Sequence, residues 1–247
     1  MSTTTATVFR SEWTKLTTLR SQWTTPLLGV LLTVGITLAV HLAYGDIDPS
    51  LTEDPSIGIY YGFNFGQVPL ACFGVLLLGQ EYNSGTIRGS LTAVPRRGLL
   101  YGGKLLLGTG VGLLAGLVGT AGSLLAVDGV IGVDFGAPGM VRSAVAGVLY
   151  CPLLVLFCLG VTAMLRNLTA AMGLLAPMVF LGTVMLAAIP GVRTVAQFLP
   201  DRAGQYAFRL ETDPDVWFGH WAGLLIMAAW AALAVWGGWR SLSRKDV

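Results

Sequence analysis

Residues 104–127 read KLLLGTGVGLLAGLVGTAGSLLAV, a continuous apolar run whose single charged residue is Lys104 at its start. A helix needs about 20 predominantly apolar residues to cross the hydrocarbon core of a bilayer. The run therefore predicts a transmembrane helix. Gly108, Gly112 and Gly116 recur every four residues, a spacing that lets helix backbones approach closely. We expect this glycine face to pack against another helix, within the subunit or across a dimer.

Five further stretches have a similar length and apolar character, at about 23–44, 58–79, 143–165, 168–189 and 216–239. The composition agrees with membrane spans, because 54% of the 247 residues are hydrophobic and only 11% are charged. Soluble domains carry about 25% charged residues, and the mean hydropathy of this chain is +0.70. We therefore predict an all-α integral membrane protein with six transmembrane helices, forming one domain over residues 1–247.

Charge is unequally divided between the two sides of this predicted bundle. Of the 15 basic residues, the side opposite the termini holds only four, which are Arg142, Arg193, Arg202 and Arg209. Most of the 13 acidic residues lie on that same side, several of them in the first loop: Asp46, Asp48, Glu53 and Asp54. Basic segments stay in the cytoplasm. The pattern predicts a multi-pass protein with both termini cytoplasmic.

Residues 8–21 precede the first span and have a helical pattern of their own. Large apolar side chains recur on one face of this segment and into the first span: Phe9, Trp13, Leu16 and Trp23. Glu12 and Lys15 point away from that face. Because tryptophan suits the headgroup level of a bilayer, we predict an interfacial elbow helix that leads into span 1.

The segment 190–215, GVRTVAQFLPDRAGQYAFRLETDPD from residue 191, is the largest piece on the side opposite the termini. It is amphipathic in places, and Pro200 and Gly204 break its pattern. We predict one or two short re-entrant helices that lie at, or dip into, the outer interface.

Two strongly polar residues, Asn64 and Gln67, fall in the middle of the second predicted span. They either hydrogen-bond to neighbouring helices or line a substrate pathway. The centres of the predicted spans hold no ionisable side chain, which disfavours a proton- or sodium-coupled carrier. The chain has neither a metal-ligand spacing nor a G-x-S-x-G nucleophile motif. We therefore expect a non-enzymatic protein with no cofactor or metal of its own.

Residues 98–105, GLLYGGKL, match the G-x-x-x-x-G-K spacing of a phosphate-binding loop. That loop requires a preceding strand, a soluble α/β sheet and a hydroxyl group for Mg²⁺ after the lysine. Here Leu105 occupies the hydroxyl position and Lys104 begins a membrane span. We interpret the match as a coincidence of glycine richness.

The loop between spans 2 and 3, EYNSGTIRGSLTAVPRRGLLYGGK, has a clear local pattern. Glu81 closes span 2, Gly85 permits a sharp turn, and Thr86 can cap a short helix that runs to about Ala93. Pro95 ends that helix, and Arg96 and Arg97 follow it. Such a helix, held parallel to the membrane, is a docking element for a soluble partner or else a basic contact with lipid headgroups.

Three segments together resemble the permease subunits of ABC transporters, of the export class that handles drugs, antibiotics and polysaccharides. They are FRSEWTKLTTLRSQWTT before span 1, GQEYNSGTIRGSLTAVPRRGLLYGGKLL after span 2, and FLPDRAGQYAF before span 6. The resemblance covers essentially the whole chain. Its most specific part is the set of residues in the loop after span 2: Glu81, Tyr82, Gly85, Thr86, Ile87, Arg88, Pro95, Arg96 and Arg97.

The resemblance implies a protein of the bacterial inner (plasma) membrane that works in pairs, with a second copy or a sister permease. Each permease would bind a separate ABC ATPase subunit, which carries ATP and Mg²⁺, while this chain carries no cofactor. The residues just named would form the coupling and docking site, with Glu81 as the transmission contact. The expected cargo is a small lipophilic or amphipathic molecule and not a nucleic acid. The alternatives are a membrane accessory or immunity-type protein, which binds a lipophilic compound without transport, and a lone secondary carrier.

Overall fold

The computed structural model describes residues 5–45, 56–93, 97–182, 185–186, 188–189 and 191–244, and every regular element in these ranges is a helix. The helices are α1 (Thr5–Thr18), α2 (Arg20–Tyr44), α3 (Ser56–Ile59), α4 (Phe63–Asn83), α5 (Ile87–Ala93), α6 (Arg97–Asp128), α7 (Met140–Leu165), α8 (Leu168–Pro177), η1 (Met178–Gly182), α10 (Arg193–Ala196), α11 (Pro200–Tyr206) and α12 (His220–Arg244).

Five of these helices are long and apolar enough to cross a membrane, namely α2, α4, α6, α7 and α12. The all-helical membrane character predicted from the sequence is therefore confirmed, whereas the count of six spans is not. The stretch 168–189 forms a shorter apolar helix, Leu168–Leu181. Its α-helical part ends at Pro177, and the chain continues as the π-helix η1. Residues 183, 184 and 187 of this stretch lie outside the described ranges.

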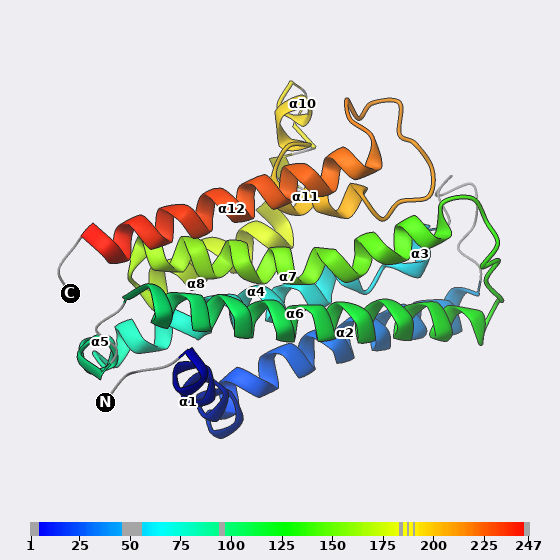
Figure 1. The fold of residues 1–247 in the computed structure, drawn as a ribbon. Coiled ribbons are helices and arrows are strands. Elements are labelled where there is room, and N and C mark those ends of the chain that lie inside the picture. The colour runs from blue at the N-terminus through cyan, green and yellow to red at the C-terminus, as the bar shows by residue number, and fades with distance from the viewer. Residues whose placement is uncertain are drawn as a thin grey trace.

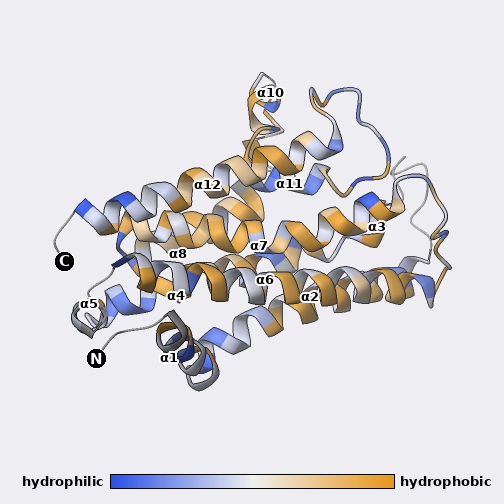
Figure 2. Ribbon diagram, viewed as in Figure 1, coloured by the Kyte–Doolittle hydropathy of each residue, from blue (hydrophilic) through white to orange (hydrophobic). Residues whose placement is uncertain are grey.

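The long helices lie side by side, with their apolar residues along the length of the bundle (Figures 1 and 2). One end of the bundle, here called the α5 end, holds α1, α5 and the last turns of α12 (Figure 1). The opposite end, the α3 end, holds α3, the α6–α7 connection and the segment before α12. The acidic residues of the first loop, at 46, 48, 53 and 54, lie outside the described ranges.

The glycine face of α6 packs within the subunit. A Cβ atom added at Gly116 would lie 2.3 Å from the carbonyl oxygen of Val148 in α7, and one at Gly112 would lie 2.6 Å from Cα of Pro152. Backbones can approach this closely only where the side chain is absent. Of the two alternatives left open by the sequence, the structure therefore places this face against α7.

The predicted short helices of segment 190–215 are present as α10 and α11. The expectation that Pro200 and Gly204 break the pattern is wrong for α11. Pro200 is the first residue of this helix, where a missing N–H costs nothing. Gly204 lies inside it, and an added Cβ would lie 2.3 Å from Sδ of Met227 in α12. Both residues thus help to form α11 and its contact with α12.

Candidate functional site

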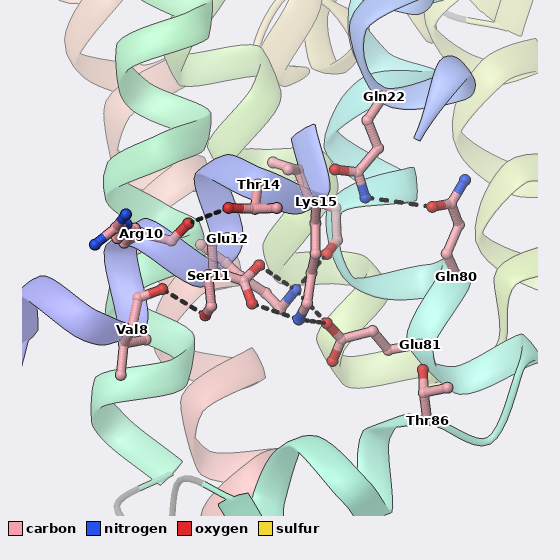
Figure 3. Close-up of polar contacts among 12 residues, drawn as sticks. Val8, Arg10, Ser11, Glu12, Thr14, Lys15, Gln22, Gln80, Glu81 and Thr86 are labelled. Carbon is pink, nitrogen blue, oxygen red and sulfur yellow. Dashed lines mark hydrogen bonds and ion pairs between the residues drawn. The ribbon is translucent and has the colours of Figure 1, made fainter. Parts of the chain in front are cut away.

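Four charged side chains from three helices meet at the α5 end of the bundle (Figure 3). This charged cluster consists of Glu12 and Lys15 of α1, Glu81 of α4 and Lys104 of α6. Lys15 Nζ lies 2.6 Å from Glu12 Oε1 and 2.7 Å from Glu81 Oε1. Lys104 Nζ lies 2.7 Å from both Glu12 Oε2 and Glu81 Oε1. With two carboxylates and two ammonium groups, the cluster has no formal net charge.

Lys104 is the most deeply buried member of the cluster. Lys104 is 0% exposed. Its ammonium group donates three hydrogen bonds, to Glu12, to Glu81 and, at 2.8 Å, to the carbonyl oxygen of Leu77. A buried ammonium group is tolerated only with such partners. The sequence placed Lys104 at the start of a span, but α6 begins seven residues earlier, at Arg97. Lys104 is therefore an interior residue of the bundle.

The orientation of α1 differs in part from the sequence prediction. Phe9 and Trp13 are exposed, as an interfacial face requires, but Leu16 is buried together with Val8 and Glu12. Glu12 does lie off the Phe9 face, yet it points into the bundle and not into water. The helical periodicity of the sequence does not predict this inward orientation of Glu12, because a glutamate on a helix normally belongs to the solvated face.

The surroundings of Lys15 favour its charged form. Burial by itself lowers the pKa of this ammonium group, but hydrogen bonds and attraction from Glu12 and Glu81 outweigh it, and the net shift is upward. Glu81 Oε1 accepts from both lysines, whereas its buried Oε2 has no hydrogen-bond partner. One oxygen of Glu81 therefore links α4 to α1 and to α6 at once.

A second polar junction joins α2 to α4 next to the charged cluster. Gln22 Nε2 donates to Gln80 Oε1 at 3.2 Å, and Gln80 Nε2 donates to Ser21 Oγ at 2.6 Å. Gln80 precedes Glu81 in the chain, so the end of α4 is held by α1, α2 and α6 together (Figure 3).

The turn and short helix predicted after span 2 are present. Gly85 has a left-handed φ of 69°, and α5 begins at Ile87, directly after Thr86. Ile87 is buried in the same hydrophobic cluster as Leu16 of α1 and Leu242 of α12, and Tyr82 packs against that cluster. Gly89 and Thr92 are exposed on the other side of α5, and Thr86, just before the helix, is exposed as well. The helix thus has one anchored side and one open side.

The structure describes only some of the remaining predicted coupling residues. Arg97 donates from Nη1 to the carbonyl oxygen of Leu242 at 2.6 Å, so it ties the start of α6 to the end of α12. The backbone of Arg88 belongs to α5, but its side chain is not among the described ones. Pro95 and Arg96 lie outside the described residues.

The phosphate-loop match at residues 98–105 lies wholly inside the α-helix α6. Gly98 faces the ring of Trp239, and a Cβ atom at Gly103 would lie 3.2 Å from Cγ1 of Val8. These glycines thus serve the packing of α6 against α12 and α1, and the lysine that follows them is bound by carboxylates.

Gln67 and Asn64, the two polar residues of the second predicted span, have different environments. Gln67 is 3% exposed, and its Oε1 accepts from the hydroxyl of Tyr150 and, at 3.0 Å, from Nε2 of Gln205. Its Nε2 donates to the carbonyl oxygen of Val179 in η1 at 3.1 Å. Gln67 therefore links α4, α7, α11 and η1. Asn64 is exposed and bonds locally to the carbonyl oxygen of Tyr61.

Within the ranges that the structure describes, no group of three or more His, Cys, Asp or Glu side chains is placed to hold a metal ion. The two carboxylates of the charged cluster bind two lysines. A scan against protein-family models finds no model that matches the chain, and a search of curated proteins finds no significant match.

Proposed function

We propose that this chain is the transmembrane permease subunit of an ATP-driven ABC exporter. In this proposal the α5 end is cytoplasmic, α1 is the interfacial elbow helix, and residues 168–189 provide the sixth span. A second permease completes the substrate pathway, and separate ATPase subunits bind ATP and Mg²⁺. The proposal is supported by the resemblance of three segments to such permeases and by the geometry around α5.

The observation that carries the proposal is the connection of α5 to the bundle. Movement of α5 would reach the bundle by two routes. The first is Ile87, which is buried in a hydrophobic cluster with side chains of α1, α4, α6, α7 and α12. The second is Glu81, six residues before Ile87, whose ion pairs hold α1 and α6. A partner that pushed on the open side of α5 would therefore act on several long helices together.

The test is purification of the tagged chain in mild detergent from its native membranes, followed by identification of bound proteins and assay of ATP hydrolysis. Gly89→Trp places a bulky ring on the open side of α5, where a Cβ atom meets nothing within 4 Å. We expect an ATPase to accompany the wild-type chain and to be lost from the Gly89→Trp variant.

Gly219→Trp is the matched control. Gly219 is also exposed with nothing within 4 Å of an added Cβ, but it lies just before α12, at the α3 end. This variant should keep the ATPase. A wild-type chain that is recovered alone, under conditions in which a known permease retains its ATPase, contradicts the proposal.

The second candidate is a membrane accessory or immunity-type protein that binds a lipophilic compound without transport. A cavity of about 540 Å³ at the α3 end, with eight Phe or Tyr residues among the 18 that line it, favours it. The purification separates the two candidates, because only the permease requires an ATPase partner.

A further inference from the structure

The cavity at the α3 end is built by segments that are far apart in the sequence. Its walls come from the turn before α4 and the first turn of α4, from η1, from α10 and α11, and from the segment between α11 and α12. Its volume of about 540 Å³ lies within the range of about 300–1,000 Å³ that is usual for small-molecule sites. It is thus large enough to hold a molecule with a substantial apolar body.

The lining is strongly enriched in aromatic residues. Eight of its 18 lining residues are Phe or Tyr, whereas aromatic residues make up 10% of the whole chain. The rings also pack against one another: the centroids of Tyr60 and Phe208 lie 5.1 Å apart, and those of Phe65 and Phe180 lie 5.9 Å apart. These rings offer a broad apolar surface to a flat or chain-like ligand.

Three arginines share the same cavity, and two of them already have carboxylate partners. Arg193 Nη2 lies 2.8 Å from Asp215 Oδ2, and Arg209 Nη1 lies 3.5 Å from Asp213 Oδ2. Among the described lining residues, Arg202 is the arginine that forms no ion pair. It is half-buried. Burial and the nearby Arg209 lower the pKa of its guanidinium, and this outweighs the opposite influence of Asp201 and Asp213. An anion would relieve both effects at Arg202.

The wall beside Arg202 is held in place by hydrogen bonds from α7. Arg142 donates to the carbonyl oxygens of Ala207 and Arg209, each at 2.7 Å, and Ser143 donates to that of Phe208. On the other side, Gln205 is bound to Gln67. Because these bonds fix both sides of the wall, the cavity is largely formed before any ligand enters, as is usual for small-molecule sites.

We propose that this cavity binds an amphipathic organic anion, whose apolar body lies against the aromatic rings and whose acidic group pairs with Arg202. The inference does not rest on the proposed function, because it requires neither ATP nor a partner chain. It concerns the ligand chemistry of this chain alone.

The test uses the purified chain in nanodiscs of phosphatidylcholine, with dansylaminoundecanoate as the anionic probe. A matched neutral probe is its methyl ester, and a matched cationic probe carries a terminal trimethylammonium group. Energy transfer from tryptophan reports binding, since Trp217 stands between two lining residues, Val216 and Phe218. Empty nanodiscs correct for partition of each probe into lipid.

We expect the anionic probe to bind most tightly to the wild-type chain. Arg202→Gln should weaken that binding about ten- to hundredfold, the range for loss of one charge-assisted hydrogen bond, and leave the ester unaffected. Arg202→Lys should retain most of the affinity. Arg10→Gln, at an exposed arginine of α1, is the control and should change nothing. Unchanged binding of the anion by Arg202→Gln, or an equal loss for ester and anion, overturns the proposal.

The acidic group could belong to a bilayer lipid or to a molecule that arrives from water. Nanodiscs that contain phosphatidylglycerol distinguish these sources. If this lipid displaces the probe from the wild-type chain but not from empty discs, the ligand is an anionic lipid. If the probe stays bound, the ligand is a separate amphiphile. Both results support the site, whereas tighter binding of the cationic probe than of the anionic one contradicts it.

Discussion

Lys104 and Glu12 lie 92 positions apart in the sequence, yet their charged atoms approach to 2.7 Å, and their side chains are 1% and 2% exposed. The pair attaches the N-terminal helix α1 to the first third of α6. Removal of one partner from a buried ion pair leaves the other charge uncompensated, which is far more costly than loss of a surface pair.

Lys104→Met should therefore destabilise the protein by about 3–5 kcal/mol, because Glu12 and Glu81 would then share only Lys15. The measurement is the thermal unfolding midpoint in detergent. Arg10→Met, at an exposed site on α1, is the control and should shift the midpoint little. Equal midpoints for the two variants would show that the buried pair contributes nothing.

The contribution of Lys15 to the charged cluster should depend on pH in alkaline solution. The pKa of Lys15 in the folded chain lies above the ordinary value of 10.5, so its contribution is complete below that value and is lost as the pH rises through the raised pKa. The difference in unfolding midpoint between wild type and Lys15→Gln should be constant from pH 7 to about 10 and shrink above that. A difference that vanishes between pH 6 and 8 would assign the contribution to another group.

The contact between α1 and α6 can be tested by cross-linking. A Cβ atom at Gly103 would lie 3.2 Å from Cγ1 of Val8. In a background without the native cysteines, Val8→Cys combined with Gly103→Cys should form a disulfide on mild oxidation, detected by mass spectrometry of the linked peptides. Phe9→Cys combined with Gly103→Cys should not, because Phe9 is on the exposed side of α1.

Gly116→Ala should cost about 1–3 kcal/mol, as overpacking of a well-packed core does. The added methyl group meets the backbone of α7, since its position lies 2.3 Å from the carbonyl oxygen of Val148. Gly110→Ala, on the same helix, is the matched control because a Cβ atom there meets nothing within 4 Å. The unfolding midpoint should fall for Gly116→Ala, and it should stay the same or rise for Gly110→Ala.

Gln67→Leu should destabilise the protein by about 1–3 kcal/mol for each buried partner that is left without a hydrogen bond. Its partners include the hydroxyl of Tyr150 and the carbonyl oxygen of Val179. Asn64→Leu is the control, because Asn64 is exposed and bonds only to its own turn. If both substitutions lowered the unfolding midpoint equally, the network around Gln67 would have no special role.

Much of the fold follows from the sequence, because long apolar runs have few alternatives to a helix in lipid. Five of the six predicted spans correspond to helices that are long and apolar enough to cross a membrane. The short helix after Gly85 and the two helices before α12 are present. The sixth span, at 168–189, is not confirmed at full length, because the α-helix there ends at Pro177 and the chain continues as the π-helix η1.

The charged cluster could not be predicted in the same way. The sequence pattern predicts Lys104 at a membrane edge and Glu12 on a solvated face. It does so because a hydropathy pattern describes one helix at a time and carries no information on neighbouring helices. Their partnership is a property of the packed bundle. A signal was present, however: the glycine at 103, next to Lys104, leaves room for α1 to approach α6.

The charged cluster also sets an order of events during synthesis. Glu12, Lys15 and Glu81 leave the ribosome before Lys104, which follows Glu81 by 23 residues. A nascent chain that has emerged only as far as α4 therefore carries two carboxylates and one ammonium group. The arrival of α6 supplies the second ammonium group, so the ion pair that joins α1 to α6 can form only at that point.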